Sequence, residues 1–345
     1  MQRPLPTART KTSIRAKTAG NLDKLNLLDR LLHLRAKTGL SVLTVLTYHR
    51  IVDFSAVGEL DPDVREVDLR GLAEQMAVAR SVGTFVSLED VRGFIQGKRK
   101  PANPILLTFD DGYVECRTTV LPFLEQSGIP ATFFIPTAFP DSGRLFWWDR
   151  ICLFLRRCRK PEITLQYPTT MFFDLRMGTE NARRALLHIV KRHAHLDLER
   201  FFDALADATN VHLDPVEERK IARNTMMNFR DVRALHDAGM AVASHSHSHR
   251  VLATLSPDEV LFDLRKSRMI LQDILGTDVR VLGYPVGHPV DGAIRKAAVL
   301  AGFDLGFTNA TGLCKAKTLD VMNIPRVAIG QDEPTEIYKW RMLLG

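Results

Sequence analysis

The feature that most constrains the fold is a repeated alternation of short apolar runs with segments of helical periodicity. The apolar runs lie at 41–51, 104–109, 131–137 and 279–287, and the helical segments lie near 68–83, within 85–98, and near 115–127 and 291–301. Continuously apolar strands joined by helices are typical of parallel sheets whose faces are both covered. We therefore predict an α/β fold built on a parallel sheet or barrel.

Two parts of the chain depart from this alternation. Residues 1–40 form a basic tail followed by leucines at helical spacing over 21–39, which predicts an amphipathic helix that packs on the main domain or contacts a partner or membrane. From about 150 to 225 the chain becomes mostly helical and charged. We interpret this stretch as an insertion within a single domain that spans 41–345.

Composition excludes several classes of protein. The 345-residue chain has no apolar run of eighteen residues, so no membrane span is expected. The net charge of +7 owes much to the tail and is not interleaved with aromatic residues, so nucleic-acid binding is not expected. The four cysteines form no CxxC pair and are expected to be reduced thiols. Without a secretory signal pattern, we expect a cytoplasmic protein, with peripheral membrane association through the N-terminal helix as an option. Its oligomeric state is left open.

Four predicted strands run directly into polar residues. These strand ends are Tyr48-His49-Arg50, Asp110-Asp111-Gly112, the run His245 to His249, and Tyr284-Pro285. Functional groups of parallel α/β domains gather at the carboxyl ends of strands. Two adjacent carboxylates there are costly unless a cation lies near them.

The run "ASHSHSHR" carries three histidines at alternating positions. A strand would place His245, His247 and His249 on one face, whereas a helical turn would bring His245 and His249 together and turn His247 away. Two imidazoles and one carboxylate with an open position describe a catalytic metal site. Separately, Asp-Asp-Gly is often only a turn, and a histidine cluster can be a solvated loop. The Asp-Asp-Gly motif and the histidine run each follow a predicted strand, and their occurrence together in this order favours the metal site.

These motifs resemble the NodB-like polysaccharide deacetylase family. The likeness rests on "LLTFDDGY", "GIPATFFIPT" and "ASHSHSHRVLATLS", and extends to "TYHRI", "LFWWDR", "VLGYPVG", "GFDLGFTNATGL" and "IPRVAI", over roughly residues 41–330. The resemblance implies a distorted (β/α) barrel with a helical insertion. It also implies removal of acetyl groups from sugars with a divalent metal. Zinc is the expected metal, and cobalt, nickel and manganese are the alternatives.

The resemblance also implies roles for individual residues. Asp110 matches the family's catalytic base, and Asp111, His245 and His249 match its metal ligands. The backbone N–H of Tyr113 matches a donor to the oxyanion. The chemistry agrees, because a base must take the proton of the attacking water and a donor must stabilise the tetrahedral oxyanion.

The chain departs from better-known members at the general acid, since no Leu-x-His motif follows residue 300. His49 is our first candidate for the acid or for a substrate contact, and a buried structural histidine is the alternative. His288 is the second candidate. The arginine that usually precedes the proline-containing motif is also absent. Arg326 could orient Asp110 in its place, the alternative being an exposed surface residue.

Two aromatic residues are candidate substrate contacts. Trp148 could offer a platform to a sugar face, although adjacent tryptophans serve equally often in packing. Tyr284, at the end of a predicted strand, is the other candidate.

The sequence thus predicts a metal-dependent hydrolase that removes acetyl groups from N-acetylated amino sugars of a polysaccharide or glycolipid-linked saccharide. Its expected partner is an acetylated carbohydrate. Two rivals remain open. One is an amidohydrolase acting on a small non-sugar amide, and the other is a catalytically silent glycan-binding protein.

Overall fold

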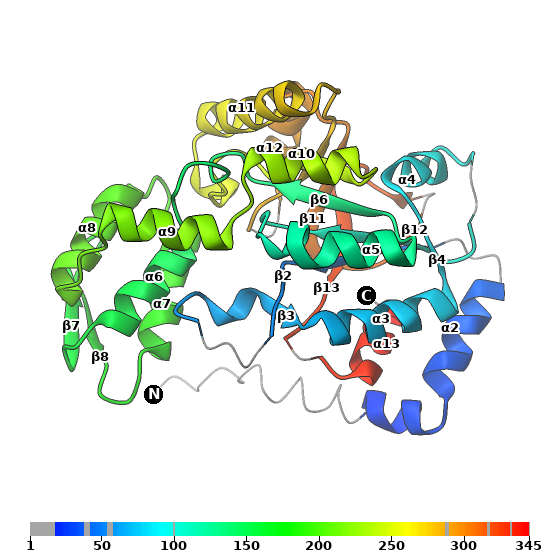
Figure 1. Ribbon diagram of the computed structural model, residues 1–345, viewed down its shortest axis with the longest axis horizontal. Coiled ribbons are helices and arrows are strands. Elements are labelled where there is room, and N and C mark those ends of the chain that lie inside the picture. The colour runs from blue at the N-terminus through cyan, green and yellow to red at the C-terminus, as the bar shows by residue number, and fades with distance from the viewer. Residues whose placement is uncertain are drawn as a thin grey trace.

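The computed structural model describes residues 18–37, 42–53, 58–98, 101–286, 290–315, 318–331 and 333–344. Seven parallel strands form a closed barrel in these ranges (Figure 1). They are β1 (Val42–Tyr48), β5 (Pro104–Phe109), β6 (Ala131–Ile135), β9 (Ala241–Ser244), β10 (Val281–Gly283), β11 (Leu305–Thr311) and β13 (Ile324–Ala328). They follow one another around the barrel in chain order, and β1 closes it by pairing with both β5 and β13. The predicted α/β barrel is confirmed.

Helices connect the strands and cover the outside of the barrel. The helices outside the insertion are α2 (Leu27–Lys37), α3 (Leu69–Val82), α4 (Leu88–Ile95), α5 (Leu121–Ser127), α10 (Phe229–Asp237), α11 (Pro257–Leu275), α12 (Gly292–Leu300) and α13 (Thr335–Leu344). The short strands β2 (Arg50–Ile51), β3 (Arg65–Val67), β4 (Thr84–Phe85) and β12 (Cys314–Lys315) lie beside the barrel. Every residue of β1, β5 and β6 is buried, which explains their unbroken apolar runs.

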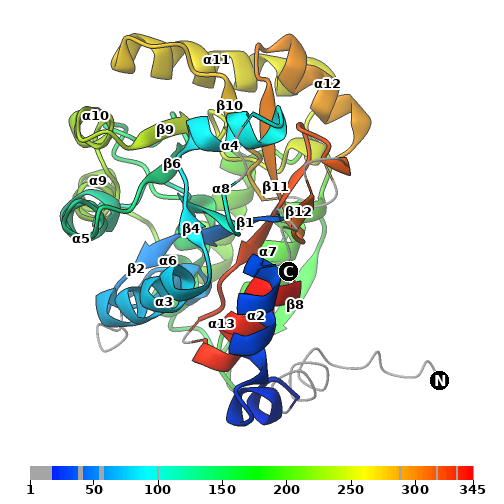
Figure 2. The same cartoon turned by 90° about the vertical axis from the view of Figure 1, so that its right-hand side faces the viewer.

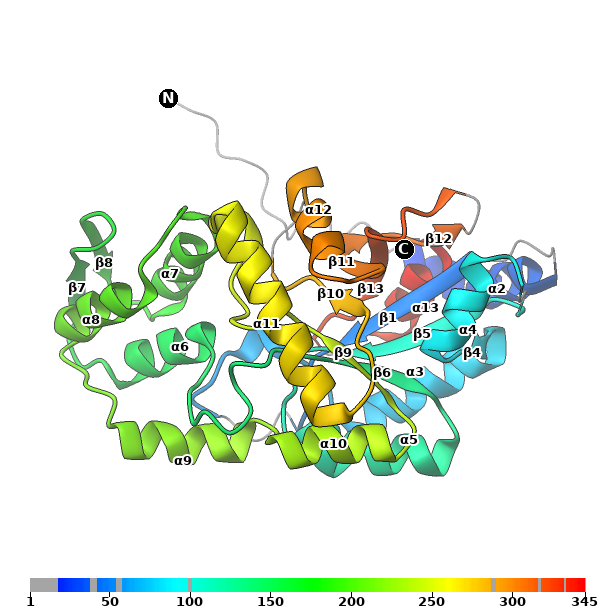
Figure 3. The same cartoon turned by 90° about the horizontal axis from the view of Figure 1, so that it is seen from above.

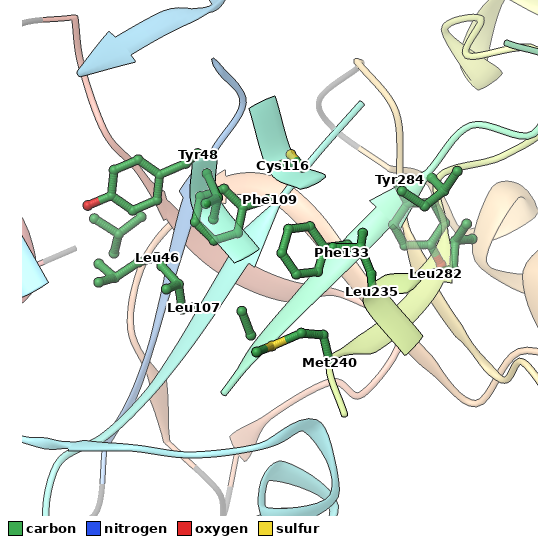
Figure 4. Packing of buried hydrophobic residues seen from close by; sticks show 14 of the residues in the cluster. Leu46, Tyr48, Leu107, Phe109, Cys116, Phe133, Leu235, Met240, Leu282 and Tyr284 are labelled. Carbon is green, nitrogen blue, oxygen red and sulfur yellow. The ribbon is translucent and has the colours of Figure 1, made fainter. Parts of the chain in front are cut away.

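Successive residues of each strand pack alternately into a core inside the barrel and a core outside it. Leu43, Val45, Leu106, Phe134 and Phe307 pack together inside the barrel. Leu46, Leu107, Phe109 and Phe133, one position along, pack outward with side chains of the covering helices, as Figure 4 shows. The period of two therefore decides which residues at the strand ends face into the barrel.

The insertion lies between β6 and β9 and occupies one end of the molecule (Figures 1 and 3). It contains α6 (Trp147–Arg157), the hairpin of β7 (Glu162–Leu165) and β8 (Met171–Asp174), α7 (Glu180–Arg192), α8 (Leu198–Thr209) and α9 (Pro215–Thr225). The hairpin was not expected from the helical pattern. A separate cluster of buried side chains, including Phe146, Leu186 and Phe201, holds these elements together.

Helix α2 packs at the opposite end of the molecule, against α13 and α3 (Figure 2). Its Leu28 and Leu32 are fully buried, and Arg35 donates to the Met342 carbonyl and to Asn103 Oδ1. Of the two roles considered for this helix, packing on the domain is the one that the structure shows. Among the described residues, no helix is both long and apolar enough to cross a membrane.

Candidate active site

The two aspartates follow β5 in a tight turn. Asp111 and Gly112 both have left-handed backbones, with φ of 73° and 72°. At Gly112 a side chain would be strained in this conformation and would also approach Ile135 at 3.3 Å. The turn keeps Asp110 in register with the inward-facing residues of β5. The Asp110 N–H donates to the Tyr48 carbonyl. Asp110 and Asp111 are therefore both buried at the carboxyl end of the barrel.

The histidine run forms a turn after β9. The Ser246 hydroxyl accepts the His249 N–H at 3.1 Å, and Asp263 of α11 accepts the N–H groups of His247 and Ser248. The His245 and His249 rings consequently meet with centroids 4.7 Å apart. The His247 ring instead bonds Thr137 Oγ1 at 2.9 Å through Nδ1 and lies outside the ligand cluster.

Asp111, His245 and His249 form a buried cluster whose ligand atoms all lie within 4.8 Å of one another. His249 Nε2 is 3.0 Å, and His245 Nε2 is 3.5 Å, from Asp111 Oδ1. His245 Nδ1 bonds the Gly283 carbonyl at 2.7 Å, and this contact turns Nε2 toward the carboxylates. The hydrogen bond also fixes the ring for metal binding, since ligating histidines usually donate their other N–H in this way.

The cluster fits a divalent cation. Although they are 3.0 Å apart, Asp111 Oδ1 and His249 Nε2 are buried and make no hydrogen bond of acceptable geometry with each other or with any other described residue. Burial alone would raise the pKa of Asp111, but the neighbouring His249 and His245 hold it well below the ordinary value. Burial lowers the pKa of His249. The site thus favours a carboxylate and a neutral imidazole, the forms that bind metal.

Asp110 is held by Arg326. The guanidinium donates to both carboxylate oxygens, at 2.8 Å each, and its Nε donates to the Thr308 carbonyl at 3.1 Å. Despite burial, Arg326 keeps the pKa of Asp110 below its usual range. Arg326 is 2% exposed, so the surface alternative for this residue is wrong. Arg326 therefore lies in direct two-point contact with Asp110, as a residue that orients this carboxylate must.

His49 follows β1 and is held by Glu66 of β3. Glu66 Oε1 is 2.7 Å from His49 Nδ1, while Oε2 accepts the backbone N–H groups of His49 and Arg50 at 3.0 Å. Burial disfavours the charged ring, but the Glu66 carboxylate, with smaller effects of Asp111 and Asp110, raises the pKa of His49 to about 10. Glu66 could not be identified from the sequence, because a single glutamate in a three-residue strand carries no distinguishing pattern.

Tyr113 and Trp148 form an aromatic wall beside His249. Trp148 Nε1 donates to the Tyr113 hydroxyl at 3.0 Å, and the Trp148 and His249 rings are 4.8 Å apart. Tyr113 forms a bridge with Met226 whose hydrogen bonds run from Met227 to Gly112 and from Val114 to Thr225. The Tyr113 N–H takes no part in this bridge, as donation to an oxyanion would require.

Two predicted site residues are not at this pocket. Tyr284 is 1% exposed and packs with Leu282 in the outer core (Figure 4), because the last residue of the β10 run faces outward. The prediction that Tyr284 contacts substrate is therefore wrong. His288 lies outside the described residues.

The site opens into a pocket of about 190 Å³. Its floor comes from the barrel and includes His49, Asp110, Asp111, His245 and His249. Its other side comes from Trp147, Trp148 and Lys191 of the insertion and from Asp61 and Asp63 in the loop before β3. The insertion thus contributes Trp147, Trp148, Leu187 and Lys191 to the walls of the pocket.

A buried polar network joins the insertion to the loop before β3. Arg183 of α7 binds Asp61 and Asp63 at 2.7 and 2.8 Å, and the Asp61 N–H donates to Asp149 Oδ1 at 2.8 Å. Asp149 Oδ2 is buried with no partner in the described part of the chain. Burial raises the pKa of Asp149 to about 7.

We expect Asp149→Asn to change the pH dependence of stability. An unfolded aspartate titrates near pH 4, so unfolding releases a proton between about pH 4 and 7, and wild-type stability falls as the pH rises through that window. Asparagine does not titrate. From pH 5 to 8 the variant should gain about 2–3 kcal/mol in unfolding free energy relative to wild type. Urea unfolding of both proteins at pH 5 and pH 8 measures this gain. The prediction is contradicted if the unfolding free energies of variant and wild type differ by the same amount at both pH values.

Comparisons with known proteins agree with the fold and with the predicted family resemblance. The sequence model of the family described as "Polysaccharide deacetylase" matches residues 97–152 and 219–306. No curated protein matches the chain. Among solved structures, Streptococcus pyogenes deacetylase PplD in complex with acetate has a TM-score of 0.56 at 14% identity, over 88% of this chain and 99% of that one. IcaB from Ammonifex degensii has a TM-score of 0.54 at 18% identity, over 88% and 97%. At these identities the neighbours show the fold. The family match confirms the predicted resemblance and a hydrolase acting on carbon–nitrogen bonds.

Proposed function

We propose that this polysaccharide deacetylase is metal-dependent and removes acetyl groups from N-acetylated amino sugars of a polysaccharide or a glycolipid-linked saccharide. One observation carries the proposal. Asp111 Oδ1 and His249 Nε2 are buried without a hydrogen bond in the described structure, and both residues line one pocket with the Arg326-bound Asp110. A buried ligand set beside an oriented carboxylate is the arrangement that metal-assisted hydrolysis needs.

Asp111, His245 and His249 would hold the cation. A bound divalent cation supplies Lewis acidity, polarising the acetyl carbonyl and activating water near neutral pH. Mixed imidazole and carboxylate ligands suit zinc, and cobalt, nickel or manganese could replace it.

The chain's own residues supply the remaining steps. Asp110 accepts the proton of the attacking water, and Arg326 keeps its carboxylate ionised and in place. The Tyr113 N–H donates to the oxyanion as it develops. The departing sugar amine needs a proton, and His49 in the pocket carries one at neutral pH. Glu66 positions His49 through Nδ1, which leaves Nε2 as the donating atom.

Glu66→Gln tests the assignment of the acid. Without the Glu66 charge, burial should bring the pKa of His49 down from about 10, so that the proton is lost at lower pH. Because the acid acts only when protonated, the alkaline limb of the kcat profile should move down by several pH units. At pH 8, kcat should fall about tenfold or more. The exposed Glu74→Gln on α3 is the control, and an unchanged pH profile in Glu66→Gln would contradict the assignment.

The two rival functions can be separated by one assay. Acetate release should be measured across N-acetylated oligosaccharides, O-acetylated oligosaccharides and small non-sugar amides. Release from N-acetylated oligosaccharides alone supports the proposal, whereas release from small amides alone favours the amidohydrolase. Saccharide binding without release of acetate from any substrate favours a silent glycan-binding protein.

Peripheral membrane association is a separate proposal. On or beside α2, Leu25, Leu31 and Leu34 are exposed, and Arg30 and Lys37 lie on the same helix, which suits an anionic lipid surface. Co-sedimentation with anionic vesicles tests it, and equal pelleting of a Leu31→Ser, Leu34→Ser variant would contradict it. The cytoplasmic location stays a prediction, which cell fractionation can check.

A further inference from the structure

A second and larger cavity lies beside the metal pocket. It encloses about 490 Å³ between the barrel and the insertion. The segment after β6, helices α6, α8 and α9, and the residues on either side of His249 line it, and Trp147 belongs to the walls of both cavities. A saccharide chain whose acetamide lies at the metal site therefore has a neighbouring space for an adjoining unit.

The walls of this cavity carry an excess of positive charge. Its lining includes Arg144, Arg150, Arg219 and Arg250, against the two carboxylates Glu199 and Glu218. The ion pairs across it, Arg144 with Glu199 and Arg150 with Glu218, are both 3.6 Å long, which exceeds hydrogen-bond distance. Glu218 also accepts the Leu145 N–H at 3.2 Å. Arg250 donates to the Leu196 carbonyl at 2.6 Å. The carboxylates present thus leave N–H groups of the other three arginines available to a ligand.

Local geometry positions two of these arginines. The Arg150 guanidinium lies 4.0 Å above the Phe202 ring, and its Nε is buried with no hydrogen-bond partner among the described residues. The stem of Arg219 crosses Gly143, where a side-chain Cβ would come within 2.4 Å of Arg219 Cγ. Gly143, with φ of 68°, thus provides the space for Arg219 at the cavity wall.

We propose that this cavity is a subsite for a carboxylate or phosphate group on the saccharide unit next to the one that is deacetylated. The inference rests on the proposed function and narrows its substrate class to acidic glycans. Guanidinium groups bind both anions through paired hydrogen bonds. A neutral glycan would leave this positive excess uncompensated.

Direct binding tests the proposal with three tetrasaccharides. One alternates N-acetylglucosamine with glucuronate, one is neutral N-acetylglucosamine, and one is its 6-phosphorylated form. Calorimetric titration of the zinc-loaded wild type should give at least about tenfold tighter binding of an acidic glycan than of the neutral one. Arg144→Gln with Arg219→Gln should abolish that preference and leave neutral binding unchanged. Removing two exposed arginines elsewhere, Arg70→Gln with Arg233→Gln, controls for overall charge.

Each outcome has one meaning. Preference for the glucuronate or for the phosphate glycan identifies which anion the subsite takes. Equal binding of acidic and neutral glycans by the wild type, or a preference that survives in the Arg144 and Arg219 variant, would overturn the subsite. Selective acidic binding without acetate release from any glycan would leave the subsite standing and refute the proposed hydrolysis.

Discussion

Asp110→Asn is expected to lower kcat for acetate release by about 10²–10⁴-fold while the protein keeps its metal. The amide has nearly the shape of the carboxylate and can still contact Arg326, but it cannot accept a proton from water. Asp111, His245 and His249 are untouched, so metal content should stay at the wild-type value. Acetate release and metal analysis on the same sample measure both quantities.

Asp304→Asn provides the matched control, because Asp304 forms ion pairs with Arg92 and Arg280 away from the pocket. It should leave kcat within about twofold of wild type, as surface ion pairs contribute little. If Asp110→Asn kept wild-type kcat, Asp110 would not be the base. If it lost its metal, the division of roles between Asp110 and Asp111 would be wrong.

His249→Ala should remove the metal and the activity together. His249 would contribute one of three ligands, and its loss should weaken metal binding more than the roughly 10–100-fold that loss of an outer-shell partner costs. His247→Ala is the control in the same turn, since the His247 ring bonds Thr137 outside the cluster. Inductively coupled plasma mass spectrometry of both variants reads the metal directly. Equal metal in His249→Ala and wild type would exclude His249 as a ligand.

The sequence predicted what depends on local period and on the order of elements. Apolar runs marked the strands, and the polar residues after β5 and β9 had to meet because parallel strands end at one edge of the barrel. In a turn, residues four apart lie together, so the spacing pairs His249 with His245 and leaves His247 out. Ser246 and Asp263, whose hydrogen bonds set that turn, then bring the rings of His245 and His249 together.

The rest depends on contacts between distant parts of the chain. Glu66 meets His49 only because the short strands β2 and β3 pair, and two or three residues give too little pattern to predict pairing. Tyr284 illustrates the opposite error. Its position at a strand end suggested a substrate contact, yet the parity of β10 turns its ring outward into the core. The arginine-lined cavity likewise combines residues from the segment after β6, from α6, α8 and α9, and from both sides of His249.

The most direct test of the account is acetate release from an N-acetylated oligosaccharide as the metal content of wild-type protein is varied. We predict about one divalent ion per chain, release of acetate with an equal amount of free amine, loss of both on chelation, and recovery on addition of Zn²⁺. Absence of bound metal in the wild type, or undiminished release from the metal-free protein, would contradict the account.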